Sequence, residues 1–285
     1  MVLLKFSDHS DAYYQASLLF QQSFHEKPNA FHYLWQASDL NHSYFFRSNN
    51  SSEIIGMCLN TTKTFNLVNQ AKISTISLSC VCIAPKYRKQ GLSRIFLDQV
   101  IKKVENEFDY ILLQAENFNY YRHLNFYDAI NCYQTEWIPQ YDNQLLINLK
   151  IYKYNQLINW KQLYCLFQND QKRHNCQWLL SYDHFVKFSK YKLVNQEIIY
   201  HYQTSFCFVD SDQLISAYGF SDVNHFIELL NHLPHQKLTL ILDQEDFDLI
   251  NQKTKKLLVQ NKVLMVQINQ KSGRKHQFCL WSYFV

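Results

Sequence analysis

The sequence predicts an α/β (α+β) fold in two parts, and three observations lead to this prediction. Apolar residues alternate with a period of two in several short stretches, which is typical of half-buried strands, and then change to helical spacing. A proline and a polar stretch at residues 139–155 indicate a boundary between domains. The same succession of strands and helices then occurs a second time. We therefore predict two domains, residues 1–145 and 150–285.

The first half is predicted to alternate strands and helices in an order that suits one sheet with covering helices. The expected elements are a helix over 10–24, strands over 43–48, 53–60 and 72–85, a helix over 91–108, a strand over 109–115, a helical turn over 119–124 and a strand over 125–138. The strand 72–85 alternates most clearly. We expect Ile76, Leu78, Cys80 and Cys82 to share one of its faces.

The second half repeats this order without a repeat of residues. It is predicted to contain a helix over 154–168, strands over 197–203, 205–210 and 213–220, a helix over 222–233, a strand over 237–243, a helix over 245–260, and strands over 262–269 and 276–284. A topological repeat of this kind indicates two copies of one fold.

Composition excludes several classes of protein. The net charge of +4 is too small for its length to indicate a nucleic-acid partner. Apolar runs all fall short of the roughly 18 residues that span a bilayer, and the N-terminus does not resemble a signal peptide. Eight cysteines occur without a CxxC pair, which favours reduced thiols and a cytoplasmic location. The oligomeric state cannot be predicted from this sequence.

Gly91 is one of only four glycines, and it lies between a predicted strand and a predicted helix. The open N–H groups of a helix start bind anions, phosphate above all, and glycine lets a ligand approach the backbone. Lys86, Arg88 and Lys89 add positive charge around the turn, and Pro85 ends the strand. The sequence therefore predicts a site for a polyphosphate here.

The stretch Arg88-Lys89-Gln90-Gly91-Leu92-Ser93 resembles the [Q/R]xxGx[G/A] signature of the GNAT N-acetyltransferase superfamily, which binds the pyrophosphate of acetyl-CoA. Ser93 stands where that signature has glycine or alanine. The resemblance implies acetyl-CoA as co-substrate, with main-chain groups of the preceding strand on its pantetheine arm. The cofactor-binding residues that it implies are Val81, Ile83, Arg88, Lys89, Gln90, Gly91, Leu92 and Ser93.

A second motif follows about 30 residues downstream. The stretch at residues 121–126 is similar to the Y-x-x-x-G-F motif of the same superfamily, with Asn125 in place of glycine. Asparagine is the residue after glycine that most readily adopts a positive φ. The resemblance implies that Tyr121 protonates the leaving thiolate of CoA. Glu116, after the strand over 109–115, is the candidate general base.

The second half lacks the phosphate motif. Its strand-to-helix junction carries Ser221 or Asp222 as an expected helix cap, and the carboxylate of Asp222 would repel a phosphate. The chain resembles tandem GNAT proteins of the enhanced intracellular survival family without their third domain, through motifs over about residues 75–130 and through topology alone beyond residue 150. That resemblance implies two acyl-CoA N-acyltransferase-like domains, each a mixed, mostly antiparallel sheet flanked by helices, with the second degenerate. It also raises the C-terminal carboxylate of Val285 as a base.

We therefore predict an acyltransferase that moves an acetyl group from acetyl-CoA to a primary amine, on a small molecule or a protein, in one ternary complex. The alternatives are a non-catalytic acyl-CoA-binding module and a protein-interaction module. We expect no nucleic-acid or membrane partner. No metal is expected, because His225, Glu228 and His232 flank the apolar stripe of their helix and are predicted to face solvent.

Overall fold

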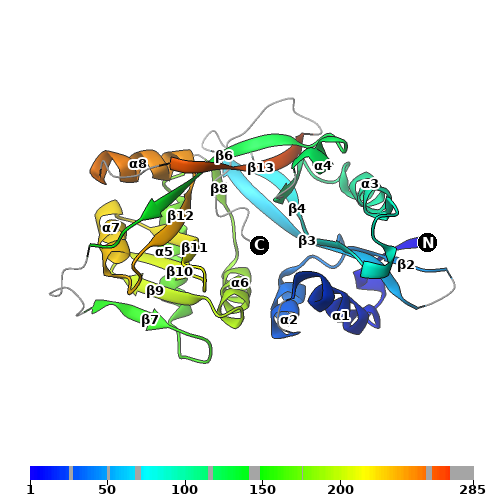
Figure 1. The fold of residues 1–285 in the computed structure, drawn as a ribbon, viewed down its shortest axis with the longest axis horizontal. Helices are drawn as coiled ribbons and strands as arrows, with labels where there is room; N and C mark the ends of the chain where they lie inside the picture. The colour runs from blue at the N-terminus through cyan, green and yellow to red at the C-terminus, as the bar shows by residue number, and fades with distance from the viewer. Residues whose placement is uncertain are drawn as a thin grey trace. The chain divides into compact units, whose positions relative to one another are not determined.

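The structure is a computed structural model that describes residues 1–25, 28–49, 52–67, 72–114, 118–140, 148–174, 176–254 and 259–269. The chain divides into two compact units, with residues 1–128 in the first and residues 129–265 in the second. Both units are mixed sheets flanked by helices, which confirms the predicted fold class (Figure 1). The predicted domain boundary near 145–150 lies partly outside the described residues, so the two domain ranges stay a prediction.

The first unit follows the predicted order with two additions at its start. Its elements are β1 (Val2–Lys5), α1 (Ala12–Phe24), α2 (Pro28–Ala37), β2 (Tyr44–Arg47), β3 (Ile54–Leu67), β4 (Lys72–Ile83), α3 (Leu92–Val104), β5 (Tyr110–Gln114), α4 (Phe118–Arg122) and β6 (Tyr127–Trp137), whose larger part belongs to the second unit. β1 and α2 were not predicted from the sequence. The sequence-based prediction also ended β3 too early, because residues 60–64 are all polar and do not alternate in the way a half-buried strand should.

The sheet of the first unit runs in the order β1-β2-β3-β4-β5. Neighbouring strands are antiparallel as far as β4, and β4 and β5 are parallel. A parallel pair needs a crossover, and α3 provides it. The helices cover both faces, with α3 on one and α1 with α2 on the other (Figure 1).

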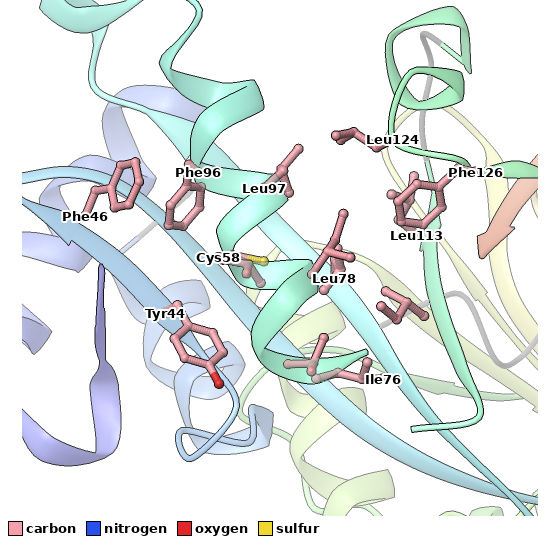
Figure 2. Close-up of a cluster of buried hydrophobic side chains, with 14 of the residues drawn as sticks. Tyr44, Phe46, Cys58, Ile76, Leu78, Phe96, Leu97, Leu113, Leu124 and Phe126 are labelled. Atoms are coloured by element: carbon pink, nitrogen blue, oxygen red, sulfur yellow. The ribbon is translucent and has the colours of Figure 1, made fainter. Parts of the chain in front are cut away.

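The core beneath α3 fixes the position of that helix on the sheet. Phe96, Leu97 and Val100 are fully buried against the strands, together with Phe46 and Ile76 (Figure 2). Burying a side chain of this size contributes about 1.5–3 kcal/mol. The start of α3, where the predicted phosphate turn lies, is therefore held rigidly against β4.

The opposite face of the sheet is packed mainly by aromatic rings. Phe6 lies against Phe45 of β2 and Trp35 of α2, with ring centroids 4.7 and 4.9 Å apart. Phe31 contacts both Phe20 and Trp35. These ring contacts join α1 and α2 to the sheet.

The second unit contains the remaining elements. They are β7 (Lys150–Tyr152), α5 (Trp160–Gln171), β8 (Cys176–Trp178), α6 (Tyr182–Val194), β9 (Ile198–Tyr202), β10 (Ser205–Val209), β11 (Leu214–Phe220), α7 (Val223–His232), β12 (Leu238–Leu242), α8 (Gln244–Thr254) and β13 (Val259–Asn269), whose residues from Val266 onward belong to the first unit. Its sheet runs β6-β12-β11-β10-β9-β7, antiparallel except for the β11–β12 pair.

The predicted elements of the second half are largely confirmed. The helix predicted over 245–260 ends earlier, at Thr254, and Val259 already belongs to β13. The sequence reading missed β7, β8 and α6, and the strand predicted over 276–284 lies outside the described residues. Among the residues that the structure describes, no helix has both the length and the apolar character needed to span a membrane.

One polar bridge ties two loops of the first unit together. His42, before β2, contacts Asp39 through Nδ1 at 2.8 Å and Glu107, before β5, through Nε2 at 2.9 Å. Burial lowers the pKa of His42, but the hydrogen bonds to Glu107 and Asp39 and their charges outweigh this effect and raise the pKa above its ordinary value.

We predict that this bridge makes the stability of the first unit depend on pH. Because the folded-state pKa of His42 is raised, its contribution is fully present below the unfolded pKa of about 6.5 and is lost as the pH rises through the folded value. Chemical unfolding of the protein and of His42→Gln at a series of pH values measures this. The stability difference between them should shrink as the pH rises, and a constant difference would contradict the linkage.

Candidate functional site

The site begins where β4 separates from its neighbour. β4 pairs with β5 only from Thr75 to Leu78 among the described residues, yet β4 continues to Ile83. The N–H of Ala84 donates to the carbonyl of Ile55 on β3. Because main-chain groups alternate along an antiparallel strand, those of Ile83 face away from β3. The end of β4 therefore offers hydrogen-bonding groups along an edge that β5 has left.

A bulge changes which side chains share a face of β4. One extra residue of β4 lies between the pairs Met57–Cys82 and Leu59–Ser79, and Cys80 adopts a φ of 50°. The core face therefore passes from Ile76 and Leu78 to Val81 and Ile83. The prediction that Cys80 and Cys82 share the face of Ile76 and Leu78 is wrong, because a regular alternation ignores the inserted residue.

The turn after β4 has the geometry predicted for an anion site. Gly91 begins α3 with a φ of 74°, and no side chain caps the helix. Arg94 and Ile95 donate the first helical hydrogen bonds to the Gly91 carbonyl, so the N–H groups of Leu92 and Ser93 lie at the open helix end. A Cβ on Gly91 would meet no atom within 4 Å, so the glycine is required by its φ rather than by crowding.

A pocket of about 590 Å³ joins these features. It brings together the end of β4, the turn, the first turn of α3, the α4 tyrosines and the end of α1. Its lining residues are Ser23, Phe24, Val81, Cys82, Ile83, Tyr87, Arg88, Lys89, Gly91, Leu92, Ser93, Leu97, Tyr120 and Tyr121.

The structure thus brings together most of the predicted site residues. Gln90 is not among the lining residues, and its side chain donates to the carbonyl of Lys86 at 3.3 Å. Glu116 and Val285, the two predicted bases, lie outside the described residues. The sequence reading missed six lining residues: Ser23, Phe24, Cys82, Tyr87, Leu97 and Tyr120. Two of them carried a signal, since Tyr87 directly precedes Arg88 of the first motif and Tyr120 adjoins Tyr121 in the second motif.

Two of the predicted cations are engaged by the protein itself. Arg88 donates through Nε to the carbonyl of Ile83 at 2.9 Å and through Nη2 to Ser23 at 3.2 Å, so it braces the end of β4 against α1. Lys86 pairs with Glu53 at 2.8 Å. Lys89, with a φ of 62°, lines the pocket. The positive charge near the open helix end therefore has a fixed part in Arg88 and a more adaptable part in Lys89.

Tyr121 lies in the pocket wall, partly buried against the core beneath α3. Burial, with smaller effects from Tyr120 and Cys58, raises its pKa to about 12, so the phenol keeps its proton at neutral pH. Asn125 adopts a φ of 61°, as the replacement of glycine by asparagine predicts. This turn lets the N–H of Phe126 bond back to the carbonyl of Tyr121 at 3.3 Å and fixes the end of α4.

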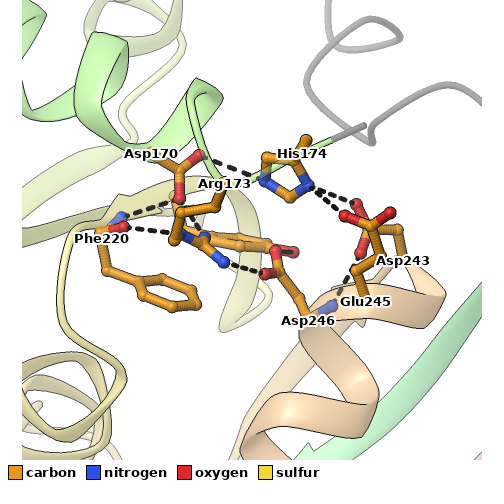
Figure 3. A network of polar contacts seen from close by, with 8 residues as sticks. Asp170, Arg173, His174, Phe220, Asp243, Glu245 and Asp246 are labelled. Atoms are coloured by element: carbon orange, nitrogen blue, oxygen red, sulfur yellow. Dashed lines mark hydrogen bonds and ion pairs between the residues drawn. The ribbon is translucent and has the colours of Figure 1, made fainter. Parts of the chain in front are cut away.

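In the second unit two parallel strands also separate, but protein side chains bond the end of the separated strand. β11 pairs with β12 only at Leu214 and Ile215 and continues to Phe220. The carboxylate of Asp170 on α5 accepts the N–H of Phe220 at 3.1 Å. Arg173 donates through Nε to the Phe220 carbonyl at 3.1 Å and stacks on its ring at 3.8 Å (Figure 3). The end of β11 is therefore already occupied by side chains.

Further polar side chains complete this network. Asp246 of α8 accepts from Arg173 at 2.9 Å and from the Tyr218 hydroxyl at 2.8 Å. His174 lies between Asp170 at 3.7 Å and Glu245 at 3.3 Å (Figure 3). The ligand atoms of His174, Asp243 and Asp246 lie within 4.8 Å of one another, a spacing that suits a metal ion. We assign no metal, because protein donors already bond Asp246.

Two further predictions for the second unit concern the cap of α7 and the exposure of His232, and the first is confirmed while the second is wrong. Asp222 caps α7 by accepting the N–H of Asn224 at 2.8 Å, which confirms the predicted cap. His232 is buried, stacks on Tyr202 and contacts the carbonyl of Glu228 through Nδ1. The prediction that it faces solvent is wrong, because the ring of Tyr202 on β9 stacks on it, which the apolar pattern of α7 does not indicate.

We predict that Arg173 is far more important for stability than Arg88, although each donates Nε to the last carbonyl of a separated strand. Arg173→Met would leave the buried Asp170 and Asp246 without their cation, which costs about 3–5 kcal/mol. Arg88→Met, the matched control, leaves no buried carboxylate and should cost about 1 kcal/mol. Hydrogen exchange of β11 and β4 amides in both variants measures this, and equal losses of protection would contradict it.

Part of the chain matches a known family, and the matched residues include the site just described. Residues 8–128 match the acetyltransferase (GNAT) family. This range ends within the first unit and includes the end of β4, the Gly91 turn and Tyr121. Residues 8–128 are therefore similar to a GNAT domain. The sequence has no match among curated proteins.

Solved structures extend the likeness in fold to nearly the whole chain. A probable N-acyltransferase from Enterococcus faecalis is 12% identical with a TM-score of 0.67, over 95% of this chain and 73% of that one. Eis1 from Mycobacterium abscessus, an enhanced intracellular survival homologue, is 7% identical with a TM-score of 0.62, over 95% and 74%. Saccharomyces cerevisiae N-myristoyltransferase with bound myristoyl-CoA is 9% identical with a TM-score of 0.58, over 97% and 84%.

Proposed function

We propose that the protein is an N-acetyltransferase whose first unit moves the acetyl group of acetyl-CoA to a primary amine while both substrates are bound. The observation that carries this proposal is a pocket of about 590 Å³ that joins the end of β4, the open start of α3 and Tyr121. The match of residues 8–128 to the GNAT family supports an acyl-CoA donor.

The pocket offers hydrogen-bonding groups that suit both the pantetheine arm and the pyrophosphate of acetyl-CoA. The two amides of pantetheine would extend the sheet along the end of β4, as peptides do at open strand edges. Ile83 would contribute its N–H, since Arg88 already holds its carbonyl. The pyrophosphate would lie at the N–H groups of Leu92 and Ser93, with Lys89 nearby.

The chemistry proposed for the site is direct. The amine nitrogen attacks the thioester carbonyl carbon, the carbon–sulfur bond breaks, and the CoA thiolate takes the proton of Tyr121. The raised pKa of Tyr121 makes it a weaker acid, but a thiolate released in the same poorly solvated pocket is also a stronger base. Glu116 remains our proposal for the group that removes the proton of the amine.

We propose that the acyl group transferred is acetyl rather than a longer acyl chain. The core beside Tyr121 is closed by side chains that are almost completely buried, among them Cys58, Leu97 and Phe126 (Figure 2). A short acyl group needs no space beyond them. The acceptor would be a small-molecule amine or a protein amine, and the cytoplasmic location predicted from the sequence belongs to the same proposal.

We further propose that the second unit does not bind CoA. Its separated strand end is filled by Asp170 and Arg173, which make the main-chain contacts that pantetheine would need. The sequence reading based the same conclusion on repulsion by Asp222. The contacts at Phe220 give a more direct reason, because they block the cleft itself.

One observation favours the alternative of a non-catalytic acyl-CoA-binding module. The pKa of Tyr121, about 12, is above that of an ordinary phenol, which weakens it as a proton donor. Calorimetry with acetyl-CoA followed by a thiol-release assay with a panel of amines separates the two functions. Binding of acetyl-CoA without release of thiol by any amine would favour the module, and absence of binding would overturn both.

We predict that Tyr121→Phe lowers the turnover number about 100-fold or more and leaves acetyl-CoA affinity nearly unchanged, because only the proton is lost. Because its pKa is raised, Tyr121 stays protonated in alkaline solution. The wild-type turnover number should therefore show no decline between about pH 8 and about pH 10. Thiol release measures both, and unchanged turnover in the variant would contradict the role of Tyr121.

A further inference from the structure

Two hydroxyl groups connect the phosphate turn to the tyrosines of α4. The phenol of Tyr120 donates a hydrogen bond to Oγ of Ser93, with the oxygens 2.7 Å apart. Both residues line the pocket. Ser93 stands where the related signature has glycine or alanine, so neither of those residues could accept this bond through a side chain.

The direction of this bond matters for what Ser93 can do. A serine hydroxyl has one hydrogen and can accept at its oxygen lone pairs. Because Tyr120 is the donor, the hydrogen of Ser93 is left for another acceptor. Ser93 belongs to the first turn of α3, beside the N–H groups at the positive end of the helix dipole. An anion at that helix end is the acceptor that this position favours.

We propose that Tyr120 and Ser93 form a hydroxyl relay in which Tyr120 donates to Ser93 and Ser93 donates to a pyrophosphate oxygen of CoA. The inference rests on the proposed acyl-CoA site and deepens it. A hydroxyl that accepts one hydrogen bond is polarised and becomes a better donor in the next. Ser93 is thus a binding residue through its side chain, and Tyr120 is a positioning residue that acts through Ser93.

Tyr120 also contacts Tyr121, the proposed general acid. The ring of Tyr120 packs edge-on against that of Tyr121, with centroids 5.0 Å apart and an interplanar angle of 86°. Fixing the Tyr120 hydroxyl at Ser93 therefore fixes one wall beside Tyr121. Tyr120→Phe keeps this ring contact and removes only the hydroxyl, which makes it the right variant for testing the relay alone.

The test compares CoA with pantetheine, which lacks the nucleotide and the pyrophosphate. Calorimetry is performed with both ligands on the wild type, Ser93→Ala, Tyr120→Phe and the double variant. Tyr164→Phe is the matched control, because it removes a phenol that donates to the carbonyl of Leu180 in the second unit. Pantetheine binding also shows that the pocket of each variant is folded.

We expect Ser93→Ala to weaken CoA binding about tenfold and pantetheine binding little, because a hydrogen bond to a charged phosphate is lost. Tyr120→Phe should weaken CoA binding less, and the double variant no more than Ser93→Ala, because Tyr120 acts through Ser93. Tyr164→Phe should match the wild type.

Other results overturn the relay. Equal losses for CoA and pantetheine would show a general change of the pocket, and additive losses in the double variant would show that the residues act separately. Unchanged CoA affinity in Ser93→Ala, with normal binding by the wild type, would refute the relay and leave the proposed function standing. A wild type that binds neither ligand would refute the acyl-CoA site and the relay with it.

Discussion

The separation of β4 from β5 is the constraint on which the rest of the first unit depends. Among the described residues β4 and β5 pair only from Thr75 to Leu78, so β5 does not pair with the end of β4, where Arg88 holds the Ile83 carbonyl. A buried edge of this kind needs a partner, which the protein or a ligand must supply. In the first unit the adjoining space is a pocket, and the turn at Gly91 and the α4 tyrosines lie around it.

The two units differ in how the main-chain groups at the end of the separated strand are bonded. In each, an arginine donates Nε to the carbonyl of the last residue of the separated strand, Arg88 to Ile83 and Arg173 to Phe220. Among the residues that the structure describes, a carboxylate also accepts the N–H of that residue only in the second unit, where Asp170 does so. One buried carboxylate and its neighbours therefore distinguish a filled cleft from an open one.

The buried charges of the second unit fit a structural role. Asp170, Asp243 and Asp246 are almost completely buried, and Arg173 bonds two of them. Burial raises the pKa of Asp243, and the charge of Asp246 adds to this effect. Buried ion pairs gain little net stability over apolar packing, but the loss of one partner is costly. Such a network fixes one arrangement of α5, α8 and β11.

In the first unit, polar groups line a pocket instead. The helix start has no side-chain cap, Gly91 keeps a φ that opens the turn, and Ser93 and Tyr120 bring hydroxyl groups to the same wall. Arg88 bonds the carbonyl of Ile83 on β4 and so keeps the main-chain groups at the end of this strand in place. The local sequence and the tertiary packing therefore serve the same site.

The sequence by itself determined the α/β order, the Gly91 turn, the position of Tyr121 and the positive φ of Asn125. These are local features, since periodicity and glycine chemistry act within a few residues. Only the tertiary structure decided the bulge at Cys80, the bracing role of Arg88, the pocket residues Ser23 and Phe24, and the filling of the second cleft by Asp170. Each of these depends on contacts between segments far apart in the chain, which no local pattern records.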